Sequence, residues 1–227
     1  MYLRTAGTAK YEQLAKHQIP WTDQSVKDAL TTMKQIVGNG QFVDKGLSGA
    51  LQVGFEDSVK LVFGANPEAA TVYEGDFVGN TIRTETTSKV GTDANFFPFP
   101  SIDGSPQAVM GGGDVAALLK PTDGGKELLK FLATPEAAEI WAPAGGFTSP
   151  NKKVDPSVYP DDISRRSAKE LVDTPVFRFD MSDLQPAAFG GTVGKGEWKI
   201  LQDWLMNPNS VDQTAQKLED ARTAAGK

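Results

Sequence analysis

The sequence has no cysteine and a single histidine, His17. Without cysteine, the chain cannot form disulfides, use a thiolate nucleophile or build a cysteine metal site. One histidine cannot build a zinc cluster, and a Ser-His-Asp triad would have to use His17. The residues around His17, at 15–19, are those of a polar helix end. We therefore expect no metal, no cofactor and no enzymatic activity.

The sequence also lacks an excess of basic residues and lacks long apolar runs. It has 23 Lys and Arg against 29 Asp and Glu, a net charge of −6, which argues against binding nucleic acid. No run of 18 apolar residues occurs, and residues 1–10 contain no apolar segment of the kind found in secretory signals. With 227 residues, 39% of them apolar, one large or two small folded domains are expected.

Apolar residues at helical spacing predict helix over most of the chain. The clearest stripe follows Asp23, a capping residue, and includes Val26, Leu30 and Met33 before Gly38 ends the helix. Ser210 and Gln213 form a predicted capping box for the last helix. The predicted helices cover 2–16, 23–37, 55–64, 77–83, 123–133, 134–142, 161–173, 197–206 and 211–221.

Strand signals are few. Residues 71–78 are rich in strand formers, and 96–102 is predicted as an extended segment or edge strand because two prolines interrupt it. A third apolar run, 109–119, contains three consecutive glycines, which favour either a bulged strand or a close approach of the backbone to a ligand. We predict a mixed α/β, helix-rich chain with too few strands for a complete sheet of its own.

Acidic residues beside aromatic residues mark candidate ligand contacts. Glu74 and Asp76 interrupt a strand-like run, so they lie either at a solvent-facing strand end or in a polar cleft. Asp180 and Asp183 either contact a ligand or belong to a loop followed by a helix capped by Ser182 or Asp183. Aromatic faces and carboxylates together suit a sugar. The candidates are Tyr73, Glu74, Asp76, Phe77, Asp114, Trp141, Phe147, Asp180, Asp183 and Phe189, with core packing the favoured alternative for Trp141.

Several motifs resemble one family of binding proteins. The chain is similar to the extracellular solute-binding proteins, family 1 (maltose-binding-protein-like), of ABC sugar importers, and most of all to their α-glucoside branch. The motifs are FLATPEAAEIWA (131–142), GGFTSPN (145–151), IPWTD (19–23), YEGDF (73–77), FPFP (97–100), GGGD (111–114) and RFDMSDLQP (178–186).

The resemblance implies a fold and a domain arrangement. These proteins have the type II periplasmic-binding-protein fold, a two-lobe Venus flytrap, and are about twice as long as this chain. Residues 1–227 resemble only the C-terminal half, so a signal sequence, the opening βα units of the first lobe and part of the second lobe are expected to lie outside it. By this resemblance, 95–144 belongs to the first lobe, whereas 1–94 and 145–227 belong to the second.

The resemblance also implies a function. It predicts a substrate-binding component that holds a neutral sugar or α-glucoside between two lobes and delivers it to the membrane permease subunits of an ABC importer. The expected location is extracytoplasmic, in the periplasm or on the cell surface as a lipoprotein. The predicted ligand-binding residues are Tyr73, Glu74, Asp76, Phe77, Gly112, Gly113, Asp114, Phe147, Asp180, Asp183 and Phe189.

Two other functions remain open from the sequence alone. A glycoside hydrolase needs two opposed carboxylates, one with a raised pKa, and nothing in the sequence marks such a pair. A scaffold fragment without a ligand would leave the clusters at 112–114 and 180–183 unexplained. A half-length chain is also expected to expose apolar surface, which predicts a homodimer through that surface.

Overall fold

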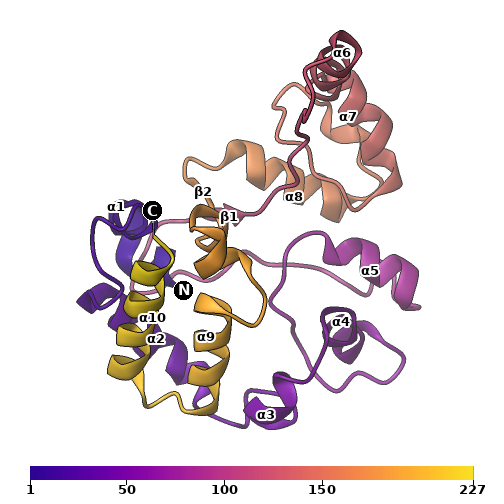
Figure 1. Ribbon diagram of the computed structural model, residues 1–227. Helices are drawn as coiled ribbons and strands as arrows, with labels where there is room; N and C mark the ends of the chain where they lie inside the picture. Colours follow the sequence, from indigo (N-terminus) through magenta and orange to yellow (C-terminus); the bar gives the residue numbers. More distant parts are fainter. Residues whose placement is uncertain (227) are drawn as a thin grey trace. The chain divides into compact units, whose positions relative to one another are not determined.

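The computed structural model describes residues 1–226 and is dominated by helices (Figure 1). Within this range the only sheet has two strands, β1 (Val109–Gly111) and β2 (Phe177–Phe179), which pair with each other. The predicted helix-rich character is therefore confirmed, while the β component of the predicted α/β class is limited to this small sheet.

The helices follow one another along the whole chain. The α-helices are α1 (Tyr2–Ala15), α2 (Gln24–Val37), α3 (Gly46–Ala50), α4 (Phe55–Phe63), α5 (Val78–Glu85), α6 (Asp123–Leu132), α7 (Pro135–Trp141), α8 (Asp162–Asp173), α9 (Gly196–Met206) and α10 (Val211–Ala224). Shorter helical turns are η1 (Ala142–Ala144), η2 (Pro156–Val158), η3 (Ser182–Leu184) and η4 (Ala187–Gly191), the last a π-helical turn.

The chain divides into two compact units. Unit 1 comprises Met1–Val53, Phe99–Gly112 and Arg178–Lys227, and unit 2 comprises Gly54–Pro98 and Gly113–Phe177. These boundaries differ from the predicted lobe segments 1–94, 95–144 and 145–227. The assignment of those segments to the lobes of a larger protein stays a prediction.

Unit 1 is built around one hydrophobic core. Helix α1 packs on α2, and α10 packs on both α2 and α9, as the lower left of Figure 1 shows. The Asp23 side chain caps α2 by accepting from the Ser25 backbone N–H, as predicted. The buried residues of this core are Leu14, Trp21, Val26, Leu30, Phe189, Trp204 and Leu218.

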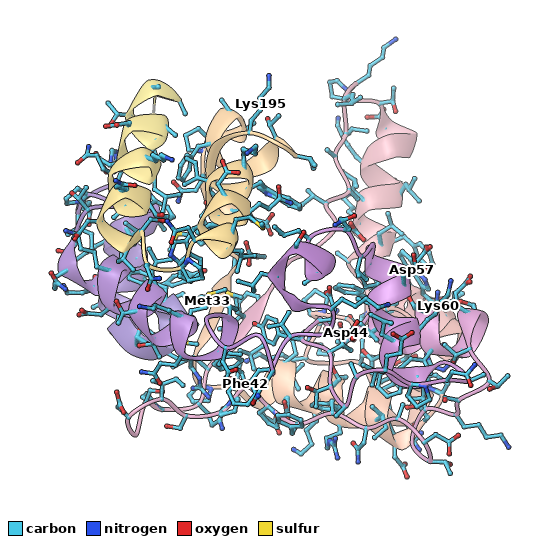
Figure 2. All side chains as sticks on the ribbon, turned by 90° about the horizontal axis from the view of Figure 1, so that it is seen from below. Met33, Phe42, Asp44, Asp57, Lys60 and Lys195 are labelled. Atoms are coloured by element: carbon cyan, nitrogen blue, oxygen red, sulfur yellow. The ribbon has the colours of Figure 1, made fainter. Side chains whose placement is uncertain are left out.

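Unit 2 has two smaller cores. Val59, Val78, Ile82 and Ala94 form one of them, where α4 packs on α5. The other contains Ala138, Ala142, Val154, Tyr159 and Ala168, around α7 and α8. Arg83 of α5 pairs with Asp161, the residue that caps α8. Figure 2 labels two exposed side chains of α4, Asp57 and Lys60, whose charged atoms lie 3.8 Å apart.

Three local predictions were wrong. Residues 71–76 form no strand, because Glu74, Gly75 and Asp76 are exposed to solvent in an irregular segment. The predicted loop over 46–54 begins with the short helix α3. The capping box at α10 does not form: Ser210 is the N-cap residue, but its hydroxyl donates to the Asn207 carbonyl at 2.7 Å instead. For 96–102, where an extended segment or an edge strand was predicted, no strand forms.

Candidate functional site

In unit 2, Asp76 holds three chain segments together. Its Oδ2 accepts from the Thr148 hydroxyl and, at 3.1 Å, from the Ser167 hydroxyl of α8. Asp76 itself lies in the irregular segment just before α5 and is exposed. The carboxylate is therefore fixed in position at the surface, where a ligand hydroxyl can also reach it.

An aromatic pair links the end of α7 to the loop that carries Thr148. The rings of Trp141 and Phe147 are stacked, with centroids 4.5 Å apart and planes 3° from parallel. Trp141 is 55% exposed, so the core-packing alternative for this residue is wrong. An exposed, oriented aromatic surface of this kind can pack on the C–H face of a sugar ring.

Two glycines explain why this loop lies close to α5. Gly145 and Gly146 both have positive φ, +78° and +70°, a conformation that residues with a Cβ rarely adopt. A Cβ on Gly145 would lie 3.2 Å from the Arg83 guanidinium, and one on Gly146 would lie 3.1 Å from the Asn80 Cβ. The close approach holds Phe147 and Thr148 beside the segment that carries Asp76.

The other predicted residues of the 73–77 motif are also at the surface. Tyr73 is 68% exposed, and Phe77 is 49% exposed and packs against Phe55 with ring centroids 5.5 Å apart. Partial burial raises the pKa of the Glu74 carboxyl, and a hydrogen bond from the Gly75 backbone opposes that shift. These residues surround Asp76 along the chain, and their side chains are accessible.

The glycine-rich segment crosses from unit 1 to unit 2. Gly112 belongs to unit 1, whereas Gly113 and Asp114 belong to unit 2, and all three are exposed. A Cβ on Gly112 would lie 3.4 Å from Oδ2 of Asp183. The structure thus places Asp183 next to Gly112.

Asp180 shapes the loop that contains Asp183. Its carboxylate accepts from the Ser182 backbone N–H at 2.9 Å and from the Ser182 hydroxyl, while its own N–H donates to the Gly111 carbonyl at 3.0 Å. Neither Ser182 nor Asp183 caps a helix with its side chain, because Asp180 closes the turn in their place. The alternative of a capped helix is therefore not what forms.

Phe189 is a predicted aromatic contact that is fully buried, whereas Phe147 is only partly buried against the core around α7 and α8. Phe189 is 0% exposed and packs edge-on against Trp21, with centroids 5.0 Å apart and planes at 67°. The π-helical turn η4 directs its ring inward. Phe189 belongs to the core of unit 1, and neither face of its ring is accessible to a sugar.

The structure adds a cavity that the sequence did not reveal. Its volume is about 270 Å³, and its lining residues are Ser182, Glu197, Trp198, Leu201, Gln202 and Leu205. Trp198 is 43% exposed, and its indole N–H donates to the Gly190 carbonyl at 2.9 Å. The apolar spacing of α9 predicts that Trp198 packs in the core. The sequence therefore contained no sign that Trp198 lines a cavity.

Glu197 is the unusual acid of this cavity. It is buried, and its Oε2 has no hydrogen-bond partner among residues 1–226. Burial, and secondly the charge of Asp180, raise the pKa of Glu197 to about 7. A carboxyl with this pKa is partly protonated at neutral pH, so it can donate a hydrogen bond as well as accept one.

Some of the predicted residues therefore lie together, in one place in each unit. In unit 2, Asp76 and Phe147 come together with Trp141; in unit 1, Asp183 lies beside Gly112, and Asp180 is close enough to raise the pKa of Glu197. Within the part of the chain that the structure describes, no three His, Asp or Glu side chains are placed to hold a metal ion. None of the helices described is long and apolar enough to cross a membrane.

Comparison with known proteins identifies two solute-binding relatives. The chain is 33% identical over 207 residues to the osmoprotective compounds-binding protein GgtB of Synechocystis sp., a match covering 89% of this chain and 47% of GgtB. It is 31% identical over 219 residues to the alpha-glucosides-binding periplasmic protein AglE of Rhizobium meliloti, covering 95% of this chain and 46% of AglE. No protein-family model and no solved structure matches the chain.

These matches establish what kind of protein the chain is related to. Both relatives are named for the solutes that they bind, and one is named as periplasmic. The chain spans about half the length of each of them. The homologues of this chain are solute-binding proteins, and neither is named as an enzyme.

Proposed function

We propose that this chain is part of the substrate-binding component of an ABC importer and that its ligand is a neutral sugar or oligosaccharide of the α-glucoside type. The protein would belong to the extracellular solute-binding family 1, with the type II two-lobe fold, and this chain would be its C-terminal half. It would act outside the cytoplasm, in the periplasm or as a surface lipoprotein, and deliver the sugar to membrane permease subunits.

The similarity to two solute-binding proteins over 89% and 95% of the chain carries this proposal. The name of one relative specifies alpha-glucosides, and that of the other specifies osmoprotective compounds. Small polyhydroxylated solutes present hydroxyl groups and apolar C–H faces. Carboxylates beside exposed aromatic rings are the side chains that bind both features.

The unit 2 surface supplies one such set of groups. Trp141, held parallel to Phe147, offers a fixed aromatic surface, and Asp76 offers a carboxylate already oriented by Thr148 and Ser167. Because these groups are ordered before ligand arrives, little side-chain entropy is lost on binding. We assign the sugar contacts of unit 2 to Trp141 and Asp76, with Tyr73 and Glu74 at the border.

The unit 1 surface supplies a second set. Trp198 and Glu197 line the cavity, and Asp183, the residue after the lining residue Ser182, adds a second carboxyl group. The Asp183 carboxyl oxygens can accept hydrogen bonds from sugar hydroxyls, whereas a protonated Glu197 can donate to a ring or glycosidic oxygen. With one acceptor and one donor, this surface would favour a ligand that has a hydroxyl and an ether oxygen at matching positions.

The hydrolase alternative has one observation in its favour and is not preferred. Glu197 has the raised pKa that a general acid needs, and Asp180 is close enough to contribute to it. However, the Asp180 carboxylate is occupied by Ser182, and both relatives are binding proteins. A scaffold without a ligand would not explain the exposed aromatic and acidic groups on both units.

Calorimetric titration with maltose, trehalose and sucrose tests the proposal. We expect saturable binding of at least one sugar, weakened about ten- to a hundredfold by Trp141→Ala or Asp183→Ala, since each removes a contact worth about 1.5–3 kcal/mol. Phe42→Ala is the matched control, because Phe42 is 67% exposed in unit 1 outside the proposed contacts.

Two results would reject the assignment. If none of the sugars binds, or if both variants bind as tightly as the parent chain, these residues are not sugar contacts. Release of glucose from any of the three disaccharides, lost in Glu197→Gln, would favour the hydrolase instead.

A further inference from the structure

The turn that follows helix α2 contains the only Asn-Gly pair of the sequence, Asn39-Gly40. Both residues are exposed. The Phe42 N–H donates to the Asn39 carbonyl at 3.0 Å and closes the turn, which leads from α2 to α3. Figure 2 labels Met33 within α2 and Phe42 at the end of the turn. A backbone nitrogen attacks the preceding asparagine side chain most readily when it belongs to glycine, because no Cβ hinders its approach.

The turn brings the two reacting groups together and leaves them free to react. Oδ1 of Asn39 accepts from the Gln41 N–H at 3.1 Å, which holds the carboxamide beside the Gly40–Gln41 peptide bond. Donation to Oδ1 also makes the side-chain carbon Cγ more electrophilic. Within residues 1–226, the Gly40 N–H donates to no other group. Its nitrogen is therefore not held away from Cγ by a hydrogen bond.

Nothing in the fold requires glycine at position 40. The φ of Gly40 lies outside the left-handed region, and a Cβ on this residue would have no atom within 4 Å. Gly38, at the end of the same helix, is different, since a Cβ there would lie 2.5 Å from the Lys34 carbonyl oxygen. The open space around Gly40 leaves its nitrogen unshielded, and it also means that alanine fits at this position.

The other asparagines lack one or more of these features. Two of them precede proline, which has no N–H to react. The N–H that follows Asn209 donates to the Asn207 carbonyl at 3.0 Å. Asn151 has both ends of its carboxamide hydrogen-bonded, to the Lys153 N–H and the Ala133 carbonyl.

The remaining two asparagines precede residues with bulkier side chains. Asn80 is followed by threonine and Asn95 by phenylalanine. Both side chains hinder the approach of the backbone nitrogen, so sequence and structure together single out Asn39.

We propose that Asn39-Gly40 is a self-modification site, at which the chain loses ammonia and acquires a carboxylate. The Gly40 nitrogen gives up its proton and bonds to Cγ of Asn39. The bond from Cγ to the side-chain nitrogen breaks, and ammonia leaves with that proton. Solvent water then opens one of the two carbonyl–nitrogen bonds of the resulting succinimide ring. The product is aspartate or isoaspartate at position 39, and the net reaction consumes one water and releases one ammonia.

Either product weakens the end of α2. The new negative charge lies one residue beyond Gly38, the C-cap, where the helix already carries partial negative charge, and Lys34 in the last turn offsets only part of the repulsion. Isoaspartate also inserts Cβ into the main chain and removes from it the carbonyl that accepts from Phe42. Because α2 packs on α1 and α10, the modification acts on the main core of unit 1.

Ageing of the purified full chain at pH 8, sampled over days, tests the site. Peptide mass spectrometry should show the mass gain of NH2 replaced by OH in the peptide that contains Asn39, and an isoaspartate methyltransferase should label the same peptide. Gly40→Ala should slow the conversion at least about tenfold, because a Cβ hinders the attacking nitrogen. Its circular dichroism should remain that of the parent chain, since the added Cβ touches nothing.

A second variant measures the consequence for stability. Asn39→Asp supplies the charge directly and should lower the urea midpoint of unfolding, in the direction that ageing moves the parent chain. Aged Gly40→Ala should show no such shift. An aged parent chain that is modified at Asn39 but unfolds at its original midpoint would overturn the effect on α2.

Three results would overturn the site itself. One is a folded chain that stays unmodified while the chain unfolded in urea converts, because the turn would then protect Asn39. The others are equal rates in the parent chain and Gly40→Ala, and faster conversion at Asn151 or Asn209. The Asp-Gly pairs at 103–104 and 123–124 form isoaspartate without a change of mass, so the mass gain separates them from Asn39. Since no sugar is added, these outcomes are independent of the sugar-binding proposal.

Discussion

Unit 1 and unit 2 differ in how completely their helices are buried. In unit 1, Trp204, Tyr11, Leu14 and Leu218 are each at most 2% exposed, and Trp204 and Leu218 belong to helices from the last part of the chain. In unit 2 the two cores are small, and α6 buries no residue at all. Unit 1 therefore contains most of the partners that its helices need, whereas unit 2 does not.

The difference lies in the connections along the chain. Unit 1 brings together segments from both ends of the sequence, so α10 can cover α2 and α9. Helix α6 of unit 2 has an equally clear apolar stripe, Leu128, Phe131 and Leu132, yet its main packing partner is α7, the next helix along the chain, and the stripe stays 40–56% exposed. An amphipathic pattern thus shows that a helix needs a partner, but it does not show that the same chain provides one.

The largest effect is expected from a core substitution in unit 1, which we compare with a substitution in the apolar stripe of α6 in unit 2. Trp204→Ala should lower the free energy of unfolding by about 3–5 kcal/mol, because a buried large side chain leaves a cavity. Leu132→Ala, at 44% exposure, should cost less than about 1 kcal/mol. Urea unfolding followed by circular dichroism measures both. Equal losses in the two variants would contradict the difference in burial between the units.

Helices with local signals could be predicted from the sequence. Asp23 caps α2 as predicted, and Thr134 and Asp161 cap the predicted helices α7 and α8. The strand expected over 71–78 failed, because a strand depends on a partner that is distant in sequence. The strand propensity of Val72 and Tyr73 says nothing about whether a partner strand is present.

The candidate site was only partly predictable for the same reason. Asp76 and Phe147 were expected from their neighbours in sequence, but the hydrogen bond from Thr148 to Asp76 spans 72 positions. Phe189 looked like a ligand contact because it stands among acids and glycines, yet its ring enters the core. Glu197 was missed because an acid in the first turn of a helix is ordinarily exposed and favourable there.

The second prediction concerns Glu197 of unit 1, which is more deeply buried than Glu74 of unit 2. Burial raises the pKa of Glu197 from 4.5 to about 7, so the folded chain retains a proton that the unfolded chain releases. The stability from this group is fully present below pH 4.5 and is lost as the pH rises through about 7.

Glu197→Gln should remove this pH dependence. At pH 8 the variant should be more stable than the parent chain by on the order of 2 kcal/mol, and near pH 4 the two should be about equal. Urea unfolding across this pH range gives the difference directly, and comparing two chains cancels the titration of the other groups. A difference that does not vary with pH would mean that Glu197 titrates normally.

The smallest expected effect is at the surface of unit 2, on α4. Lys60 lies 3.8 Å from Asp57 and 3.5 Å from Glu85, and all three side chains are between 38% and 74% exposed (Figure 2). Solvent and salt screen such pairs, so Lys60→Met should change the free energy of unfolding by less than about 0.5 kcal/mol. The same measurement in 1 M NaCl should reduce even that change. A loss as large as that of Trp204→Ala would show that α4 depends on these charges rather than on Val59, its one buried side chain.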